Sequence, residues 1–208
     1  MSKLPKRALI VIDVQNEYVT GNLRIESPDV QQSLANIGKA MDAAYAAGIP
    51  VAVVQHLTPA GSPIFARGSQ GAKLHPVVAE RHRDHLVEKS MASALTGTDL
   101  GDWLRMHGID TLSVVGYMTH NCDDSTVRQA KHEGWSVELL HDAAGSIPYA
   151  NALGSASAEE IHRVFTVVMH TGFAAVVSTN EWLRAIERGE ALQTDNIYLS
   201  NQRARESR

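Results

Sequence analysis

The feature that most constrains this chain is an alternation between short apolar runs and segments with helical spacing. The apolar runs lie at 8–12, 51–55, 85–88, 111–115, 136–140 and 174–177. Between them, apolar residues recur every three or four positions over 29–47, 99–106, 121–132, 158–169 and 181–187. Strands that are apolar throughout and are separated by helices are typical of a parallel sheet covered on both faces. The pattern therefore predicts an α/β fold with a mainly parallel sheet.

Length, charge and hydropathy limit the classes of protein that fit. The 208 residues suit one domain, residues 1–208, with a core at about 8–187 and a polar tail at about 189–208. We expect that tail to be a frayed terminus or an arm that docks on a partner subunit. The net charge is −4, whereas nucleic-acid-binding domains are usually basic, so we expect no nucleic-acid partner. No apolar run is long enough to span a membrane or to form a signal peptide, which predicts a cytoplasmic protein.

Three chemically useful side chains follow predicted strands. Asp13 follows the first run, Lys89 follows the third, and Cys122 lies in the segment after the fourth. Ligands of open parallel sheets bind beyond the carboxyl ends of the strands, so we expect these side chains at the same edge. Each also has a simpler explanation. Cys122 can be an inert buried thiol, Asp13 a backbone cap and Lys89 a solvated surface residue.

Cys122 is the only cysteine of the chain, which excludes an intramolecular disulfide and any multi-cysteine metal site. The segment GYMTHNC at 116–122 predicts a tight turn into a helix, with Thr119 as a candidate N-cap. Unpaired N–H groups and the helix dipole at such a position favour a thiolate and can also hold an oxyanion. Asp123 and Asp124 come next, and we expect both to point away from the pocket.

If the three side chains meet, they form a set of groups suited to nucleophilic catalysis. The ammonium of Lys89 would lower the pKa of Asp13, and the thiol beside both would lose its proton more easily. Asp13 can then act as general base, Lys89 as electrostatic stabiliser and Cys122 as nucleophile.

Three longer stretches together resemble the isochorismatase-like cysteine hydrolases, the superfamily that includes nicotinamidases and N-carbamoylsarcosine amidohydrolases. They are ALIVIDVQNEY at 8–18, VEKSMASALTGTDLGDWL at 87–104 and VVGYMTHNCDDSTVRQAKHEGWSVELLHDA at 114–143. The resemblance covers about residues 8–187. It implies a three-layer α/β/α sandwich with a six-stranded parallel sheet, and a homo-oligomer, either a dimer or a tetramer.

The resemblance also implies a mechanism. Asp13, Lys89 and Cys122 match the catalytic triad of the family. Tyr117–Met118 matches a non-proline cis peptide, which implies an oxyanion hole made by the N–H groups of Met118 and Cys122. The implied activity is hydrolysis of a C–N bond in a small carboxamide, ureide or lactam through a thioester at Cys122, without a cofactor.

Departures from the family narrow the function. Nicotinamidases carry a metal site built from an Asp and His residues after the second strand, whereas 55–65 reads QHLTPAGSPIF with a lone His56. We therefore expect no metal. Isochorismatases that cleave a vinyl ether lack the cysteine, which makes that activity the alternative rather than the main prediction. A catalytically silent protein that binds a small ligand or serves as an oligomeric module is the alternative from a different class.

Three further residues are candidates for the substrate pocket. Tyr18 matches an aromatic residue that lines the pocket in relatives, His56 ends the second strand, and Phe65 lies in the long loop at 57–71. Their alternatives are core packing, a structural histidine and a loop anchor. The histidine-rich stretch at 75–85 lacks a matching carboxylate pattern, so we expect a charged surface there rather than a metal site.

Overall fold

The centre of the protein is a six-stranded parallel sheet. The structure is a computed structural model and describes residues 4–206. The strand order is β3-β2-β1-β4-β5-β8, and every neighbouring pair is parallel. The strands are β1 (Arg7–Ile12), β2 (Val51–His56), β3 (His85–Lys89), β4 (Thr111–Tyr117), β5 (Ser136–Gly145) and β8 (Ala175–Val177). The predicted fold class is confirmed, because each predicted run coincides with one of these strands.

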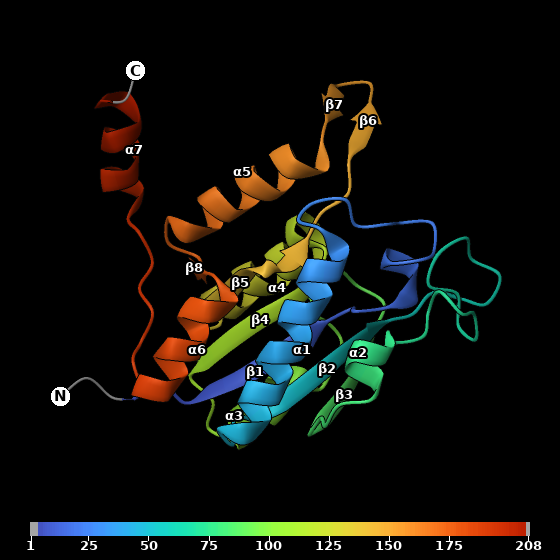
Figure 1. Cartoon of the computed structure of the whole chain (residues 1–208), viewed down its shortest axis with the longest axis horizontal. Helices are drawn as coiled ribbons and strands as arrows, with labels where there is room; N and C mark the ends of the chain where they lie inside the picture. Colours follow the sequence, from blue (N-terminus) through green and yellow to red (C-terminus); the bar gives the residue numbers. More distant parts are fainter. Residues whose placement is uncertain (1–3, 207–208) are drawn as a thin grey trace.

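Helices cover both faces of the sheet, which makes a three-layer arrangement (Figure 1). One layer contains α1 (Val30–Ala46), α2 (Pro76–Ala79) and α6 (Thr179–Arg188). The other contains α3 (Leu100–Met106), α4 (Asp124–His132) and α5 (Ala158–His170). In Figure 1, α1 lies in front of the sheet and α4 behind it.

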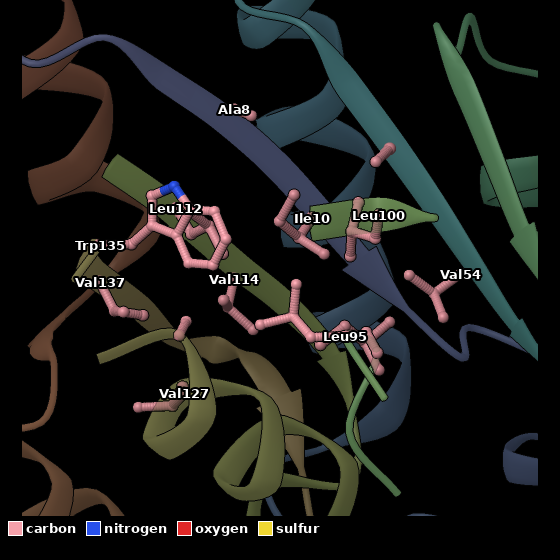
Figure 2. Close-up of a cluster of buried hydrophobic side chains, with 14 of the residues drawn as sticks. Ala8, Ile10, Val54, Leu95, Leu100, Leu112, Val114, Val127, Trp135 and Val137 are labelled. Carbon is pink, nitrogen blue, oxygen red and sulfur yellow. The ribbon is translucent and has the colours of Figure 1, made fainter. Parts of the chain in front are cut away.

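The core consists of two apolar clusters, one on each face of the sheet. Strand β1 is buried along its whole length, with Leu9 and Val11 in the α1 cluster and Ile10 in the cluster with α3 and α4. Figure 2 shows Ile10 in this second cluster, among side chains that include Leu112 and Val127. Burial of one such side chain contributes about 1.5–3 kcal/mol. This two-sided burial explains why the strand sequences are apolar throughout rather than alternating.

Three backbone features shape the carboxyl end of the sheet. Asp13, directly after β1, has a φ of 51°, a left-handed conformation that is uncommon for residues other than glycine. Gly116 in β4 has a φ of 121°, and a Cβ there would lie 2.0 Å from the carbonyl oxygen of Ile12. Only glycine allows β4 to pass this close to the end of β1. The peptide bond between Tyr117 and Met118 is cis.

A hairpin and the last helix are among the elements that have no counterpart in the sequence prediction. Strands β6 (Tyr149–Asn151) and β7 (Gly154–Ala156) form an antiparallel hairpin that projects from the body of the protein (Figure 1). The tail contains the helix α7 (Ile197–Glu206), which stands apart from the sheet and has no buried residue. The last tail arginine, Arg208, lies outside the described residues. Within residues 4–206, no helix has the length and hydropathy needed to cross a membrane.

Candidate active site

Asp13, Lys89 and Cys122 lie at the same edge of the sheet. Asp13 follows β1, and Lys89 is the last residue of β3. Cys122 lies in η2 (Thr119–Asp123), a π-helical turn between β4 and α4. Because β1, β3 and β4 run parallel, their carboxyl ends reach this edge together, and the three side chains converge there.

The Lys89 ammonium joins the other two groups. Its Nζ lies 2.7 Å from Oδ2 of Asp13, and both side chains are fully buried. The same Nζ donates to Cys122 Sγ at 3.3 Å and to the carbonyl oxygen of Met91 at 3.0 Å. The contact with Asp13 is a buried ion pair, in which the attraction between the two charges is strong at this separation. Lys89 is therefore not the solvated surface residue that was its simpler explanation.

His56 is the fourth neighbour of Lys89. Its Nδ1 lies 3.2 Å from Nζ, and burial together with the charge on Lys89 lowers the pKa of His56 to about 4. The imidazole is therefore neutral at physiological pH, and Nδ1 accepts a hydrogen bond from the ammonium, which places the ring hydrogen on Nε2. An ammonium has three N–H donors, so Lys89 shares them among four neighbours.

Burial controls the protonation of the three groups. It raises the pKa of the Cys122 thiol, and the charge on Asp13 adds to the rise. It also raises the pKa of Asp13, although Lys89 opposes this effect. For Lys89, burial lowers the pKa, but attraction to Asp13 and Cys122 outweighs burial and leaves it raised. Desolvation of the sulfur thus outweighs the two effects that the sequence analysis expected to favour a thiolate, namely the helix start and the neighbouring Lys89.

The three pocket candidates lie together over this site. The ring of Phe65 lies 5.2 Å from that of Tyr18 and 5.3 Å from that of His56. Tyr18 also packs edge-on against Tyr117 at 5.5 Å. Phe65 is buried and has a φ of 52°, a conformation that costs energy in a residue with a side chain. Burial raises the pKa of Tyr18, and the electrostatic influence of Cys122 and Asp13 adds to the rise.

Gln15 is a buried residue that the sequence analysis missed. Its Oε1 accepts from the N–H of His56 at 2.9 Å, and its Nε2 donates to the carbonyl oxygens of His56 and Ala72 at 2.9 and 2.7 Å. One amide thus ties the end of β2 to the loop that follows it and fixes the backbone of His56. The available signal was an amide side chain two positions after Asp13, just beyond the apolar run at 8–12.

Thr119 does not cap the helix as predicted. The N-cap position of η2 is Met118, and it has no side-chain capping hydrogen bond. The Thr119 hydroxyl instead makes a long-range hydrogen bond, 2.9 Å from Nδ1 of His162 on α5. Burial is the main reason why the pKa of His162 falls to about 4. The turn that carries Cys122 is therefore joined to α5.

With this geometry established, comparison with known proteins assigns the family. Residues 7–181 match the family described as Isochorismatase domain. The chain belongs to the isochorismatase family of hydrolases. The resemblance inferred from three sequence stretches is thereby confirmed.

Two solved structures and one relative found by sequence match most of the chain. An isochorismatase-family protein from Burkholderia xenovorans LB400 is 66% identical, with a TM-score of 0.98 and 99% of each chain covered. A cysteine hydrolase from Pseudomonas syringae pv. phaseolicola is 27% identical, with a TM-score of 0.81 and coverage of 91% of this chain and all of the other. The ureidoacrylate amidohydrolase of Acinetobacter baylyi is 28% identical over 218 residues, covering 89% of this chain and 85% of its own.

Asp123 and Asp124, the two acids that follow Cys122, have different environments. Asp124 is paired with Arg128 at 2.8 Å, on the outer side of α4. Asp123 is fully buried, and neither of its oxygens has a hydrogen-bond partner among the described residues. Burial and then the charge on Asp13 hold the pKa of Asp123 well above its usual range. Asp123 is therefore enclosed in the protein, and the direction of its side chain relative to the pocket stays a prediction.

The histidines of the 75–85 stretch have separate partners. His75 caps α2 by accepting from Val77, His82 contacts Asp84, and His85 contacts Asp99. Among residues 4–206, no group of three or more His, Cys, Asp or Glu side chains has an arrangement that could hold a metal ion.

Proposed function

We propose that this protein is a cysteine amidohydrolase that cleaves a C–N bond of a small carboxamide, ureide or lactam. The observation that carries the proposal is the buried Lys89 ammonium, which contacts both the Asp13 carboxylate and the Cys122 sulfur. An acid, a cation and a thiol in one desolvated cluster provide a base, a charge stabiliser and a nucleophile. No cofactor enters this reaction.

The chemistry proceeds in two stages. Asp13 takes the thiol proton as Cys122 Sγ attacks the substrate carbonyl carbon, and the resulting tetrahedral oxyanion is held by the N–H groups of Met118 and Cys122. Asp13 then gives its proton to the leaving ammonia or amine, and a thioester remains. Water attacks the thioester with Asp13 as base, the acid is released, and the sulfur regains its proton.

The raised pKa of the Cys122 thiol is compatible with this sequence of events. The thiol keeps its proton at rest, so deprotonation accompanies attack rather than preceding it. The adjacent Lys89 stays protonated, because its own pKa is raised, and offsets the negative charge that passes from Asp13 to sulfur. The cation therefore stabilises both the resting carboxylate and the attacking thiolate.

The relatives support a C–N bond as the target. One is named a cysteine hydrolase and another a ureidoacrylate amidohydrolase, and both align over most of the chain. The alternative, hydrolysis of a vinyl ether, would need no nucleophilic thiol, so the contact between Lys89 and Cys122 favours the amidohydrolase. The substrate is a small molecule, to which Tyr18, His56 and Phe65 would present the pocket wall.

The deciding experiment is a release assay with a chemical trap. Ammonia is measured from a panel of amides, ureides and lactams, and a slow amide is used to trap the acyl-enzyme for intact-mass analysis. Wild-type protein should release ammonia and gain the acyl mass at Cys122. Cys122→Ala and Cys122→Ser should lose turnover and the adduct while keeping their circular dichroism spectrum. Wild-type rates in Cys122→Ala would refute the proposal, as would a panel with no substrate.

We also propose that the protein is a cytoplasmic, single-domain homo-oligomer, either a dimer or a tetramer. Two apolar surfaces of the described chain support the assembly. Val164, Val167 and Val168 are exposed on α5, and Ile197, Tyr198 and Leu199 are exposed on α7. Apolar patches of this kind mark contact surfaces. Light scattering after size exclusion should give a multiple of the 22.6 kDa chain, and Val167→Glu should lower it. A monomeric wild type would contradict the proposal.

A further inference from the structure

Three polar side chains outside the triad form a continuous hydrogen-bonded chain. Nδ1 of His120 lies 3.0 Å from Oγ of Ser146, and Nε2 of the same ring lies 3.0 Å from the hydroxyl of Tyr149. They come from three elements: Ser146 directly follows β5, His120 belongs to η2, and Tyr149 begins β6. The His120 and Tyr149 rings are also packed edge-to-face at 5.2 Å.

These three hydrogen-bonded side chains are joined to the turn that carries Cys122. His120 is two residues before Cys122 in the same turn, so the Tyr149 hydroxyl is fixed to the segment that carries the sulfur. Charge on Cys122 contributes, after burial, to the raised pKa of Tyr149. On its other side, the Tyr149 ring is 44% exposed and lines an open hollow of about 610 Å³ together with Leu23 and Ile147. Tyr149 thus connects this open hollow, through its hydrogen bond to His120, with the turn that carries Cys122.

The charge state of His120 decides which groups of a ligand these three hydrogen-bonded side chains can bind. Burial lowers the pKa of His120 to about 4, against a smaller opposing effect of Asp124, which is itself paired with Arg128. The other groups packed near the imidazole are the Phe165 ring at 6.0 Å and His162, whose pKa is also about 4. At neutral pH the imidazole therefore has one donor and one acceptor nitrogen.

The two tautomers of His120 give Tyr149 opposite roles. When Nδ1–H donates to Ser146, Nε2 accepts from the Tyr149 O–H, and the phenol offers its lone pairs to a ligand. When Ser146 donates to Nδ1, Nε2–H donates to the phenol oxygen, and the phenol O–H is free to donate. The hydrogen-bonded side chains of Ser146, His120 and Tyr149 can therefore bind either an N–H or a C=O group of a ligand without any change in charge.

We propose that Tyr149 is a substrate-binding, specificity-determining residue that holds an uncharged N–H or C=O group next to the scissile carbonyl, and that His120 is its positioning residue. This inference rests on the proposed function and narrows its substrate class to amides and ureides with such a polar neighbour. The contact that Tyr149 offers comes from a neutral hydroxyl held by a neutral imidazole, so it suits an uncharged group. The exposed Arg24 lies in the hollow and donates to the carbonyl oxygen of Gly21.

Two matched probes test the contact. N-Ethylurea and butyramide have the same heavy-atom skeleton and differ in having an N–H or a CH₂ next to the scissile carbonyl. Tyr149→Phe removes only the hydroxyl. Tyr45→Phe is the matched control, since Tyr45 also packs against a histidine, at 5.0 Å from His82, but lies 65% exposed on α1.

The kinetic readout is the ratio of kcat/KM for the two probes. Tyr149→Phe should lower this urea-to-amide ratio by about fivefold to tenfold, the effect of one lost hydrogen bond between uncharged groups. Tyr45→Phe should leave it unchanged. His120→Ala should reproduce the Tyr149→Phe effect, whereas His120→Gln, which can still contact the phenol, should restore part of the ratio. A ratio within twofold of wild type in Tyr149→Phe would overturn the inference.

A binding measurement separates this inference from the proposed function. Probe binding is measured by ligand-observed NMR in a Cys122→Ala background, where no turnover is needed. Tyr149→Phe should weaken N-ethylurea binding by a similar factor and leave butyramide unchanged. If wild type hydrolyses no amide but this binding difference is found, the proposed function fails and the Tyr149 contact stands. Equal binding with and without the hydroxyl, or no binding of either probe, overturns the contact even if amides are hydrolysed.

Discussion

A double-mutant cycle on the Asp13–Lys89 pair tests whether the centre of the site is a coupled, buried ion pair. The two charges lie 2.7 Å apart and both side chains are fully buried. Lys89→Met leaves a carboxylate without its counterion, and Asp13→Asn leaves a buried ammonium. Removal of one partner of such a pair costs about 3–5 kcal/mol of folding free energy, whereas replacement of both is often neutral.

These values predict a distinct pattern. Each single variant should lose about 3–5 kcal/mol, because one desolvated charge remains. At 2–4 °C per kcal/mol for a chain of this size, that corresponds to a fall in Tm of roughly 6–20 °C. The Asp13→Asn/Lys89→Met double variant should return to within about 1 kcal/mol of wild type. All three should lack amidase activity, since loss of the general base alone costs about 10²–10⁴-fold.

The assay is urea unfolding at pH 7 and one fixed protein concentration, followed by circular dichroism. The control is the same cycle on Arg67 and Glu88, which lie 2.9 Å apart but are 61% and 52% exposed. That exposed pair should show a coupling below about 1 kcal/mol. Additive losses, in which the double variant loses as much stability as the two single variants together, would refute the description of the site as a coupled buried pair.

Three further predictions concern buried ionisable groups. Glu138 accepts a hydrogen bond from buried Arg7 at 2.8 Å, so Glu138→Ala should lower the free energy of unfolding in urea by about 3–5 kcal/mol. The control is Glu133→Ala, which breaks the exposed pair with Arg105 and should cost under about 1 kcal/mol. Equal losses in the two variants would contradict this prediction. The pKa of His162 is about 4 in the folded protein, below its value in the unfolded chain. As the pH falls, the unfolded chain therefore takes up this proton at a higher pH than the folded protein does. Stability should fall by up to about 3 kcal/mol between about pH 6.5 and pH 4. His162→Gln should flatten that slope, and an unchanged slope would exclude this source. The pKa of Asp123 is raised above its unfolded value, so stability is lost as the pH rises above about 4. In urea unfolding, Asp123→Asn should lose less stability than wild type between pH 5 and 8, and an equal loss would contradict this.

The sequence determined the architecture because a buried parallel strand leaves a local record. Residues of β1 and β4 must be apolar on both faces, so 8–12 and 111–115 could be recognised without any knowledge of their partners. The parallel direction then placed Asp13, Lys89 and Cys122 at one edge, and in the structure these side chains touch. The hairpin β6–β7 and the helix α7 escaped prediction because their exposed residues carry no apolar periodicity.

Only the tertiary structure decided the electrostatics and the long-range contacts of the site. The protonation of Cys122 depends on how completely its sulfur is desolvated, and the burial of Asp123 depends on which residues pack over it. Neither the desolvation nor the burial can be predicted from the residues that are adjacent in sequence. Likewise, Gln15 reaches the backbone of His56, and His120 reaches Tyr149, across 41 and 29 positions of chain. Local patterns specify which residues form strands and helices. Which polar groups then meet, and with what charge, follows from packing between elements that are remote in sequence.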